Sequence, residues 1–276
     1  IMKIALIAMS GIRACDEELL HLGLTLPGFV ERSKTIASLP SLGLLTLAGM
    51  TPPEHTLTYL EVDDIRDLKE VPQGFDLVAV SSFSAQINEA YDLADRYRKI
   101  GIPTVLGGLH ATVLPEEAGR HFDSVVVGEG ELCWLEILED AQAGQLKAVY
   151  NVLDREFDLA DAPMPAFELL DISNYNRLTV QTSRGCPHRC EFCASSILLT
   201  RKYKQKPIEK VVAEIDRIHS IWPRPFIEFA DDNSFVNHRY WKKLLPLLGK
   251  RRLRWFAETD ISVADDPDLL DLMRES

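Results

Sequence analysis

The first half of the chain alternates short β-branched runs with longer amphipathic stretches, and this alternation restricts its fold more than any other feature. The runs predict strands over Lys3–Ala8, Thr56–Val62, Leu77–Ser81, Thr104–Leu106 and Ser124–Val127. Between them lie predicted helices, for example Leu42–Ala48, Ile87–Ile100 and Leu132–Ala141. Strands that alternate with helices form a parallel sheet covered on both faces. The sequence therefore predicts an α/β fold, with a doubly wound domain of the Rossmann or flavodoxin type over residues 1–153.

Small and polar residues follow three of these strands. They are Ser81, Ser82 and Ser84, then Gly107, Gly108 and His110, then Gly128, Glu129 and Gly130. The carboxyl ends of parallel strands meet at one edge, where doubly wound sheets bind ligands. Glycines there admit a large flat ligand, and serines offer hydroxyl groups. Such turns also favour Gly and Ser for purely conformational reasons. The turn after the first strand, residues 10–14, lacks the G-x-G-x-x-G pattern of a dinucleotide site.

Three of the five cysteines, Cys186, Cys190 and Cys193, fall within eight residues after a predicted strand. This spacing indicates a metal site in a reducing compartment rather than a disulfide framework. Three thiolates on a four-iron cluster leave one iron without a protein ligand, open to a substrate. Structural zinc held with His188 is the alternative, although zinc sites usually pair C-x-x-C with a second, distant pair.

The rest of the chain suggests a Pro-containing linker over residues 154–176 and then a second domain over 177–276. In that domain a helix over 207–219, a strand over 226–229, a helix over 240–248 and a strand over 254–257 repeat one strand–helix unit. Polar side chains follow its strands, namely Asp231, Asp232, Asn233 and Glu258. Barrel enzymes keep their chemistry at such strand ends. For Asp232 and Asp260, capping of the next helical turn is an equal alternative.

These motifs together resemble one enzyme family. The sequences G-G-L-H-A-T at 107–112 and G-E-G-E at 128–131 are similar to those of the cobalamin-binding domain that precedes many radical S-adenosylmethionine (SAM) enzymes. The pattern C-x-x-x-C-x-Φ-C, with Phe192 as the aromatic residue Φ, resembles the radical SAM signature. The resemblance is to the class B methyltransferases, and it covers nearly the whole chain.

The resemblance implies a [4Fe-4S] cluster on Cys186, Cys190 and Cys193 that binds SAM at its open iron. SAM contacts would come from Phe192, Asp231, Asp232, Asn233 and Glu258, and cobalamin contacts from the three strand-end groups named above. The implied reaction is reductive cleavage of SAM to a 5′-deoxyadenosyl radical, with methyl transfer through cobalamin to an unactivated carbon of a small-molecule substrate. Implied partners are that substrate and an electron donor such as flavodoxin or ferredoxin. The catalytic residues stay unassigned.

Other functions remain open on the sequence. The D-x-H-x-x-G motif that supplies a histidine to cobalt in other cobalamin proteins is missing, since Asp16 and His21 are too far apart. His110 is better explained by hydrogen bonds within its own loop. Cyclisation or rearrangement on the same architecture is one alternative, and a non-catalytic cobalamin or iron–sulfur binder is another. A transfer-RNA methylthiolating enzyme needs three more cysteines, but the first half offers only Cys15 and Cys133, and Cys133 is expected in the core.

The charge balance and the hydropathy of the chain restrict the partners and the location that it can have. The chain has 276 residues, with 30 basic and 42 acidic side chains and a net charge of −12. That balance argues against nucleic acid as a partner. The run Arg201, Lys202, Lys204 and Lys206 is expected to be a solvated face, or alternatively a docking patch for an acidic electron donor.

No apolar run is long enough to span a membrane, so we expect a cytoplasmic protein. The second domain has room for about three of the roughly six barrel units of the family, so the chain is expected to be truncated.

Overall fold

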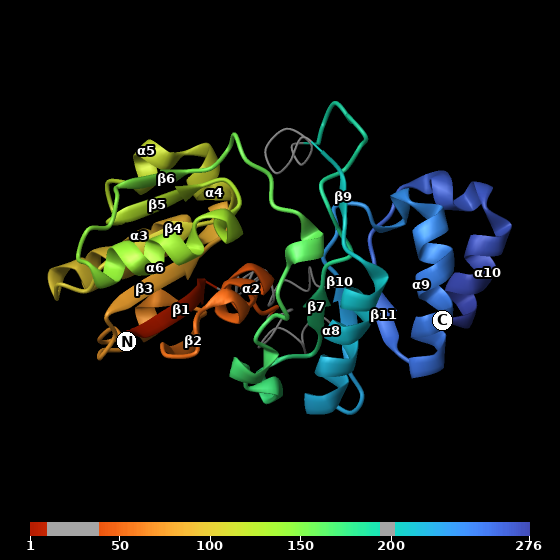
Figure 1. The fold of residues 1–276 in the computed structure, drawn as a ribbon, viewed down its shortest axis with the longest axis horizontal. Helices are drawn as coiled ribbons and strands as arrows, with labels where there is room; N and C mark the ends of the chain where they lie inside the picture. The colour runs from red at the N-terminus through yellow and green to blue at the C-terminus, as the bar shows by residue number, and fades with distance from the viewer. Residues whose placement is uncertain (10–38, 194–201) are drawn as a thin grey trace, which may run out of the picture.

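A computed structural model describes residues 1–9, 39–193 and 202–276. It contains two α/β units joined by a packed connecting segment (Figure 1). The turn at residues 10–14, together with Cys15, Asp16 and His21, lies outside the described residues. No helix in the described ranges is both long and apolar enough to cross a membrane.

The first unit is a six-stranded parallel sheet in the order β2-β1-β3-β4-β5-β6. Its strands are β1 (Lys3–Met9), β2 (Thr56–Val62), β3 (Leu77–Ser81), β4 (Thr104–Gly107), β5 (Ser124–Val127) and β6 (Val149–Asn151). The order follows the flavodoxin-like arrangement with one strand added. The predicted doubly wound fold is confirmed. The strand β6 was missed because three residues carry no readable periodicity.

Helices cover both faces of this sheet. They are α2 (Leu42–Met50), α3 (Ile87–Lys99), α4 (Leu109–Val113), α5 (Pro115–Ala118) and α6 (Trp134–Gln142). Alternate residues of each strand point to opposite faces, so β1 supplies Ile7 to the core beneath α3 and Leu6 to the core beneath α2 and α6. The helix α2 is apolar on all sides. It buries Leu44 in the sheet core and Leu45 in the core of the second unit, and it therefore joins the two.

The second unit has a three-stranded parallel sheet in the order β11-β10-β7, with helices packed against it. Its elements are β7 (Leu178–Val180), α8 (Ile208–Ile221), β10 (Phe226–Phe229), α9 (His238–Arg251), β11 (Arg254–Phe256) and α10 (Pro267–Glu275). A two-stranded antiparallel pair, β8 (Ser183–Arg184) with β9 (Lys204–Gln205), stands beside it. The expected strand–helix repeat is thus present.

The segment between the units packs against both. Short helical turns at Leu159–Asp161, Phe167–Leu169 and Ile172–Asn174 interrupt it. Phe167 is fully buried in the core of the second unit, and the amide of Ala166 donates to the carbonyl of Leu45 at 3.0 Å. At Gly49 the backbone of α2 approaches the carbonyl oxygen of Met164 so closely that an added Cβ would lie 2.1 Å from it.

Candidate functional site

One cavity of about 320 Å³ opens between the two units. The carboxyl ends of β3, β4 and β5 form one wall, and α2 and α6 extend it. Ends of strands in the second unit close the other side. Its polar or flexible lining includes Ser81, Gly107, Gly108, Gly128, Glu129, Gly130, Gln181, Arg184 and Asp232. The cavity therefore lies where a doubly wound sheet is expected to bind ligand.

Two glycines of this rim hold backbone conformations that other residues rarely adopt. Gly108 has φ of +101° and Gly128 has φ of +108°. At Gly128 a Cβ would also lie 3.0 Å from the side chain of Val152. A side chain at either position would be strained, so these glycines shape a rim where backbone itself lines the cavity.

Of the predicted cobalamin residues, Ser81, Gly107, Gly108, Gly128, Glu129 and Gly130 line the cavity, while Ser82, Ser84 and His110 do not. The ring of His110 is 8% exposed. Its Nδ1 lies 3.0 Å from Ser84 Oγ, and its Nε2 lies 3.1 Å from the hydroxyl of Tyr91 and 3.3 Å from Glu117 Oε1. The ring is hydrogen-bonded, as expected, but to residues of three other segments and not within its own loop. These bonds also occupy Ser84.

Three free cysteines stand on the loop that follows β8. Cys186 and Cys193 are partly exposed and Cys190 is exposed. The amide of Cys193 donates to the carbonyl of Cys190 at 3.0 Å, which bends the loop back on itself. Three reduced thiols at this spacing fit a four-iron cluster by their chemistry. Within the described residues, however, no three His, Cys, Asp or Glu side chains stand close enough to ligate a metal as a group. Phe192, the expected adenine contact, is 92% exposed.

Two carboxylates that follow β10 accept hydrogen bonds from the backbone just before the cysteine loop. Buried Asp231 accepts from the amides of Thr182 and Ser183 at 2.7 and 2.9 Å, and from the hydroxyl of Thr182 at 2.6 Å. Burial raises the pKa of Asp231, and these hydrogen bonds oppose the shift. Asp232 accepts from the amide of Gly185 at 2.9 Å and lines the cavity.

The neighbouring polar residues complete this support. Asn233 donates to Asp260, which also caps the turn at Ser262 and lies 3.2 Å from His188 Nε2. Bonds from Ser262 and Asn233 lower the pKa of Asp260 to about 2. The capping alternative is therefore the one that Asp260 follows. The side chain of Glu258 is exposed, and its backbone carbonyl accepts from the amide of Ser234. Among these residues, Asp232 alone faces the cavity.

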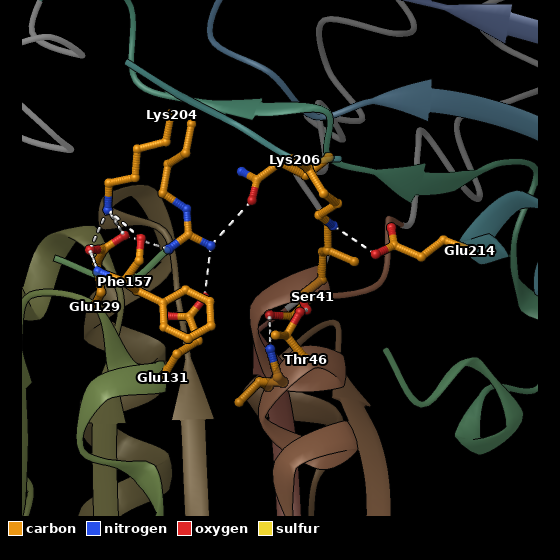
Figure 2. A network of polar contacts seen from close by, with 12 residues as sticks. Ser41, Thr46, Glu129, Glu131, Phe157, Lys204, Lys206 and Glu214 are labelled. Atoms are coloured by element: carbon orange, nitrogen blue, oxygen red, sulfur yellow. Dashed lines mark hydrogen bonds and ion pairs between the residues drawn. The ribbon is translucent and has the colours of Figure 1, made fainter. Parts of the chain in front are cut away.

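Ion pairs also join the residues that flank the loop to the first unit, and the sequence analysis did not predict them. Arg184 pairs with Glu129 and Glu131, each at 2.7 Å, and Lys204 pairs with Glu129 at 2.6 Å. Lys206 is buried and pairs with Glu214 at 2.7 Å (Figure 2). The expectation of a solvated face was wrong for Lys204 and Lys206, since Lys204 turns to the partly buried Glu129 and Lys206 to the buried Glu214. Lys202 is exposed as expected, and Arg201 lies outside the described residues. Both residues of β9 are partly buried, and two residues are too few to show a periodicity from which these pairs could have been predicted.

The expectation for Cys133 was correct. Its side chain is 2% exposed, and burial raises the pKa of its thiol to about 11. A thiol in that state is a poor metal ligand. Cys133 lies in the core of the first domain and does not line the cavity.

Comparisons with known proteins agree with this architecture. Residues 37–138 match the B12 binding domain family. The chain is 30% identical over 247 residues to the uncharacterized methyltransferase sll1242 of Synechocystis sp., covering 86% of this chain and 45% of that protein. It is 27% identical over 240 residues to the bacteriochlorophyllide d C-8(2)-methyltransferase of Chlorobaculum tepidum, covering 82% and 52%. It is 30% identical over 250 residues to the hopanoid C-2 methylase of Rhodopseudomonas palustris, covering 87% and 47%. The chain thus spans about half the length of these relatives.

Solved structures show the same fold. The cobalamin-dependent SAM radical enzyme OxsB with aqua-cobalamin bound superposes with a TM-score of 0.67 at 17% identity, over 100% of this chain and 42% of that one. The radical SAM methyltransferase TsrM from Kitasatospora setae, with cobalamin and a [4Fe-4S] cluster bound, gives 0.66 at 14% identity, over 99% and 58%. The chain thus contains a B12-binding domain, is similar in sequence to methyltransferases, and shares its fold with cobalamin-dependent radical SAM enzymes.

Proposed function

We propose that the chain holds the cofactors of a cobalamin-dependent radical SAM methyltransferase that acts on a small molecule. The observation that carries this proposal is the shared cavity. One wall is the glycine-rich rim of the B12-binding sheet, and the other contains Arg184 and Asp232, which flank or hold the cysteine loop. A corrin bound at the rim would therefore face the loop, as transfer of a methyl group between two cofactors requires.

In this proposal Cys186, Cys190 and Cys193 hold a [4Fe-4S] cluster. When bound, the cluster supplies the electron that cleaves SAM reductively. The chain's own part is to position these groups. Asp231 accepts from the amide of Ser183 and Asp232 accepts from the amide of Gly185, which fixes the backbone that leads into the loop. The rim of the six-stranded sheet forms the opposite wall of the cavity.

The carboxamide and phosphate edges of a corrin need hydrogen-bond partners, and the rim supplies backbone groups and Ser81 for them. Ala79, Val105 and Val126 give the cavity an apolar lining, which would exclude water from a bound corrin. No histidine lines the cavity in the described residues, so we propose that the protein contacts the corrin mainly through backbone and small side chains.

The proposal is tested by anaerobic reconstitution with iron and sulfide, followed by addition of hydroxocobalamin, SAM and a reductant. We expect about four irons per chain, a bound corrin spectrum and release of 5′-deoxyadenosine. Cys190→Ala should lose the iron and the nucleoside but keep the corrin. Gly107→Val places a branched side chain on the cavity wall and should lose the corrin but keep the iron. Cys133→Ala is the matched control and should keep all three. An iron-free wild-type chain would overturn the cluster assignment, and a corrin-free chain would overturn the cobalamin assignment.

Radical cyclisation is the second candidate. The anaerobic magnesium-protoporphyrin IX monomethyl ester cyclase of Synechocystis sp. is 26% identical over 240 residues, covering 74% of this chain. Chromatography separates the two outcomes, because methyl transfer from SAM also yields S-adenosylhomocysteine and cyclisation does not.

A further inference from the structure

The two strands that flank the loop of the three cysteines pair with each other, and ion pairs to the first domain are made at this point. The strands β8 and β9 flank this loop, and their antiparallel register sets Arg184 directly opposite Lys204. Two cations opposite each other destabilise a strand pair. The base of the cysteine loop therefore needs an anion between its strands.

Glu129 provides that anion from the other domain. Its Oε1 accepts from Arg184 Nη1 and from Lys204 Nζ, both at 2.7 Å, and its Oε2 accepts from Lys204 Nζ at 2.6 Å. The amide of Phe157 also donates to Oε2 at 2.8 Å, and Lys204 donates to the carbonyl of Phe157 at 3.0 Å (Figure 2). Both oxygens of Glu129 are thus engaged by protein donors, although the residue stands on the cavity rim.

Glu131 extends the contact, since its Oε1 accepts from Arg184 Nη2 at 2.7 Å. We call Glu129, Glu131, Arg184 and Lys204 the interdomain clamp. It contains two cations and two carboxylates, whose side chains are between 9% and 21% exposed. Its charges cancel within the protein, away from most of the solvent. Removal of the Glu129 carboxylate therefore leaves the poorly hydrated Lys204 ammonium with the Phe157 carbonyl alone among the acceptors named above.

Electrostatics agree with this arrangement. Burial would raise the pKa of Glu129, but bonds from Lys204, Phe157 and Arg184 outweigh it and lower the pKa below its ordinary value. Glu129 is therefore ionised at neutral pH and remains a partner for both cations.

We propose that Glu129 is a positioning residue that fixes the base of the cysteine loop against the rim of the B12-binding sheet, and not a ligand of the corrin. The placement of the loop is a property of the chain alone. The interpretation that the interdomain clamp sets the distance between cluster and corrin rests on the proposed function.

The first experiment follows amide hydrogen exchange in the cofactor-free chain. In Glu129→Gln we expect peptides within residues 182–193 and 202–206 to exchange roughly ten-fold faster than in the wild type, with the six-stranded sheet unchanged. Glu117→Gln is the matched control, because Glu117 is a half-exposed carboxylate of the same domain outside the clamp, and it should leave these peptides unchanged. Glu129→Asp keeps the charge and shortens the side chain by one methylene, so it should restore at least half of the lost protection.

The second experiment titrates hydroxocobalamin into the same variants and follows its absorption. A dissociation constant within about three-fold of wild type in Glu129→Gln, together with the faster loop exchange, supports the proposal. Unchanged loop exchange overturns it, whatever the corrin affinity. A loss of affinity of ten-fold or more with protected loop amides identifies Glu129 as a corrin ligand and also overturns it. If the wild-type chain binds neither iron nor corrin, the proposed function fails, yet hydrogen exchange still decides whether the clamp holds the loop.

Discussion

Truncation of Leu45 tests whether α2 joins the two domains energetically. Leu45 is fully buried, and it belongs to a helix of the first domain while it packs in the core of the second. Leu45→Ala removes three carbons, which at ~0.8 kcal/mol each is about 2.4 kcal/mol of transfer free energy. The cavity left behind adds to this, so we expect a loss of about 3–4 kcal/mol in the free energy of unfolding.

The assay is urea unfolding of the cofactor-free chain, followed by tryptophan fluorescence. Trp134 reports on the first domain, and Trp241 and Trp255 report on the second. With a denaturant slope of about 3 kcal/mol/M, the midpoint should fall by roughly 1 M. Both domains should be affected, because the removed side chain joins their cores.

Leu135→Ala is the control, since Leu135 lies on α6 and is 45% exposed. It should cost less than about 1 kcal/mol. If Leu45→Ala costs no more than Leu135→Ala, α2 does not support the second core and the reasoning fails.

Two further pairs of variants follow from the packing. Gly49→Ala should destabilise the chain by about 1–3 kcal/mol in urea unfolding, because its Cβ would meet the carbonyl of Met164, whereas Gly43→Ala in the same helix meets nothing within 4 Å and should be neutral or slightly stabilising. Equal effects at the two glycines would contradict this close approach. Lys206→Met leaves the buried carboxylate of Glu214 unpaired and should cost about 3–5 kcal/mol at pH 7, while the double variant with Glu214→Leu should return to within roughly 1 kcal/mol of wild type. Burial raises the pKa of Glu214 and Lys206 opposes this, so a folded-state pKa above the unfolded value makes the single variant regain stability as the pH falls from 7 towards about 5. A stability gap to wild type that is independent of pH would refute the ion-pair explanation.

Local patterns account for the elements that sequence analysis predicted well. The strands of the first sheet have short β-branched runs, and the predicted bounds of β2, β3 and β5 agree with the structure. The cysteine spacing is equally local, because eight adjacent residues carry it. The α/β fold and the loop with three thiols could therefore be derived from contiguous segments.

Interactions between distant segments could not be derived in this way. Glu129 was expected to contact cobalamin because it follows a strand, but its partners stand 55 and 75 positions further along the chain. Asp231 was expected to contact SAM, yet its carboxylate is buried beneath Thr182 and Ser183. A strand-end position predicts that a residue is near the site. It does not show which groups the side chain contacts.

By itself, the sequence determined the alternation of strands and helices, the glycine-rich rim and the three-cysteine loop, since each depends on periodicity or spacing within a short segment. Only the tertiary structure decided that α2 belongs to two cores, that Lys204 and Lys206 turn inward and that Glu129 binds the base of the loop. The physical reason is that a buried charge requires an opposite charge or hydrogen-bonding partner nearby, and packing of the two domains determines which partner it meets.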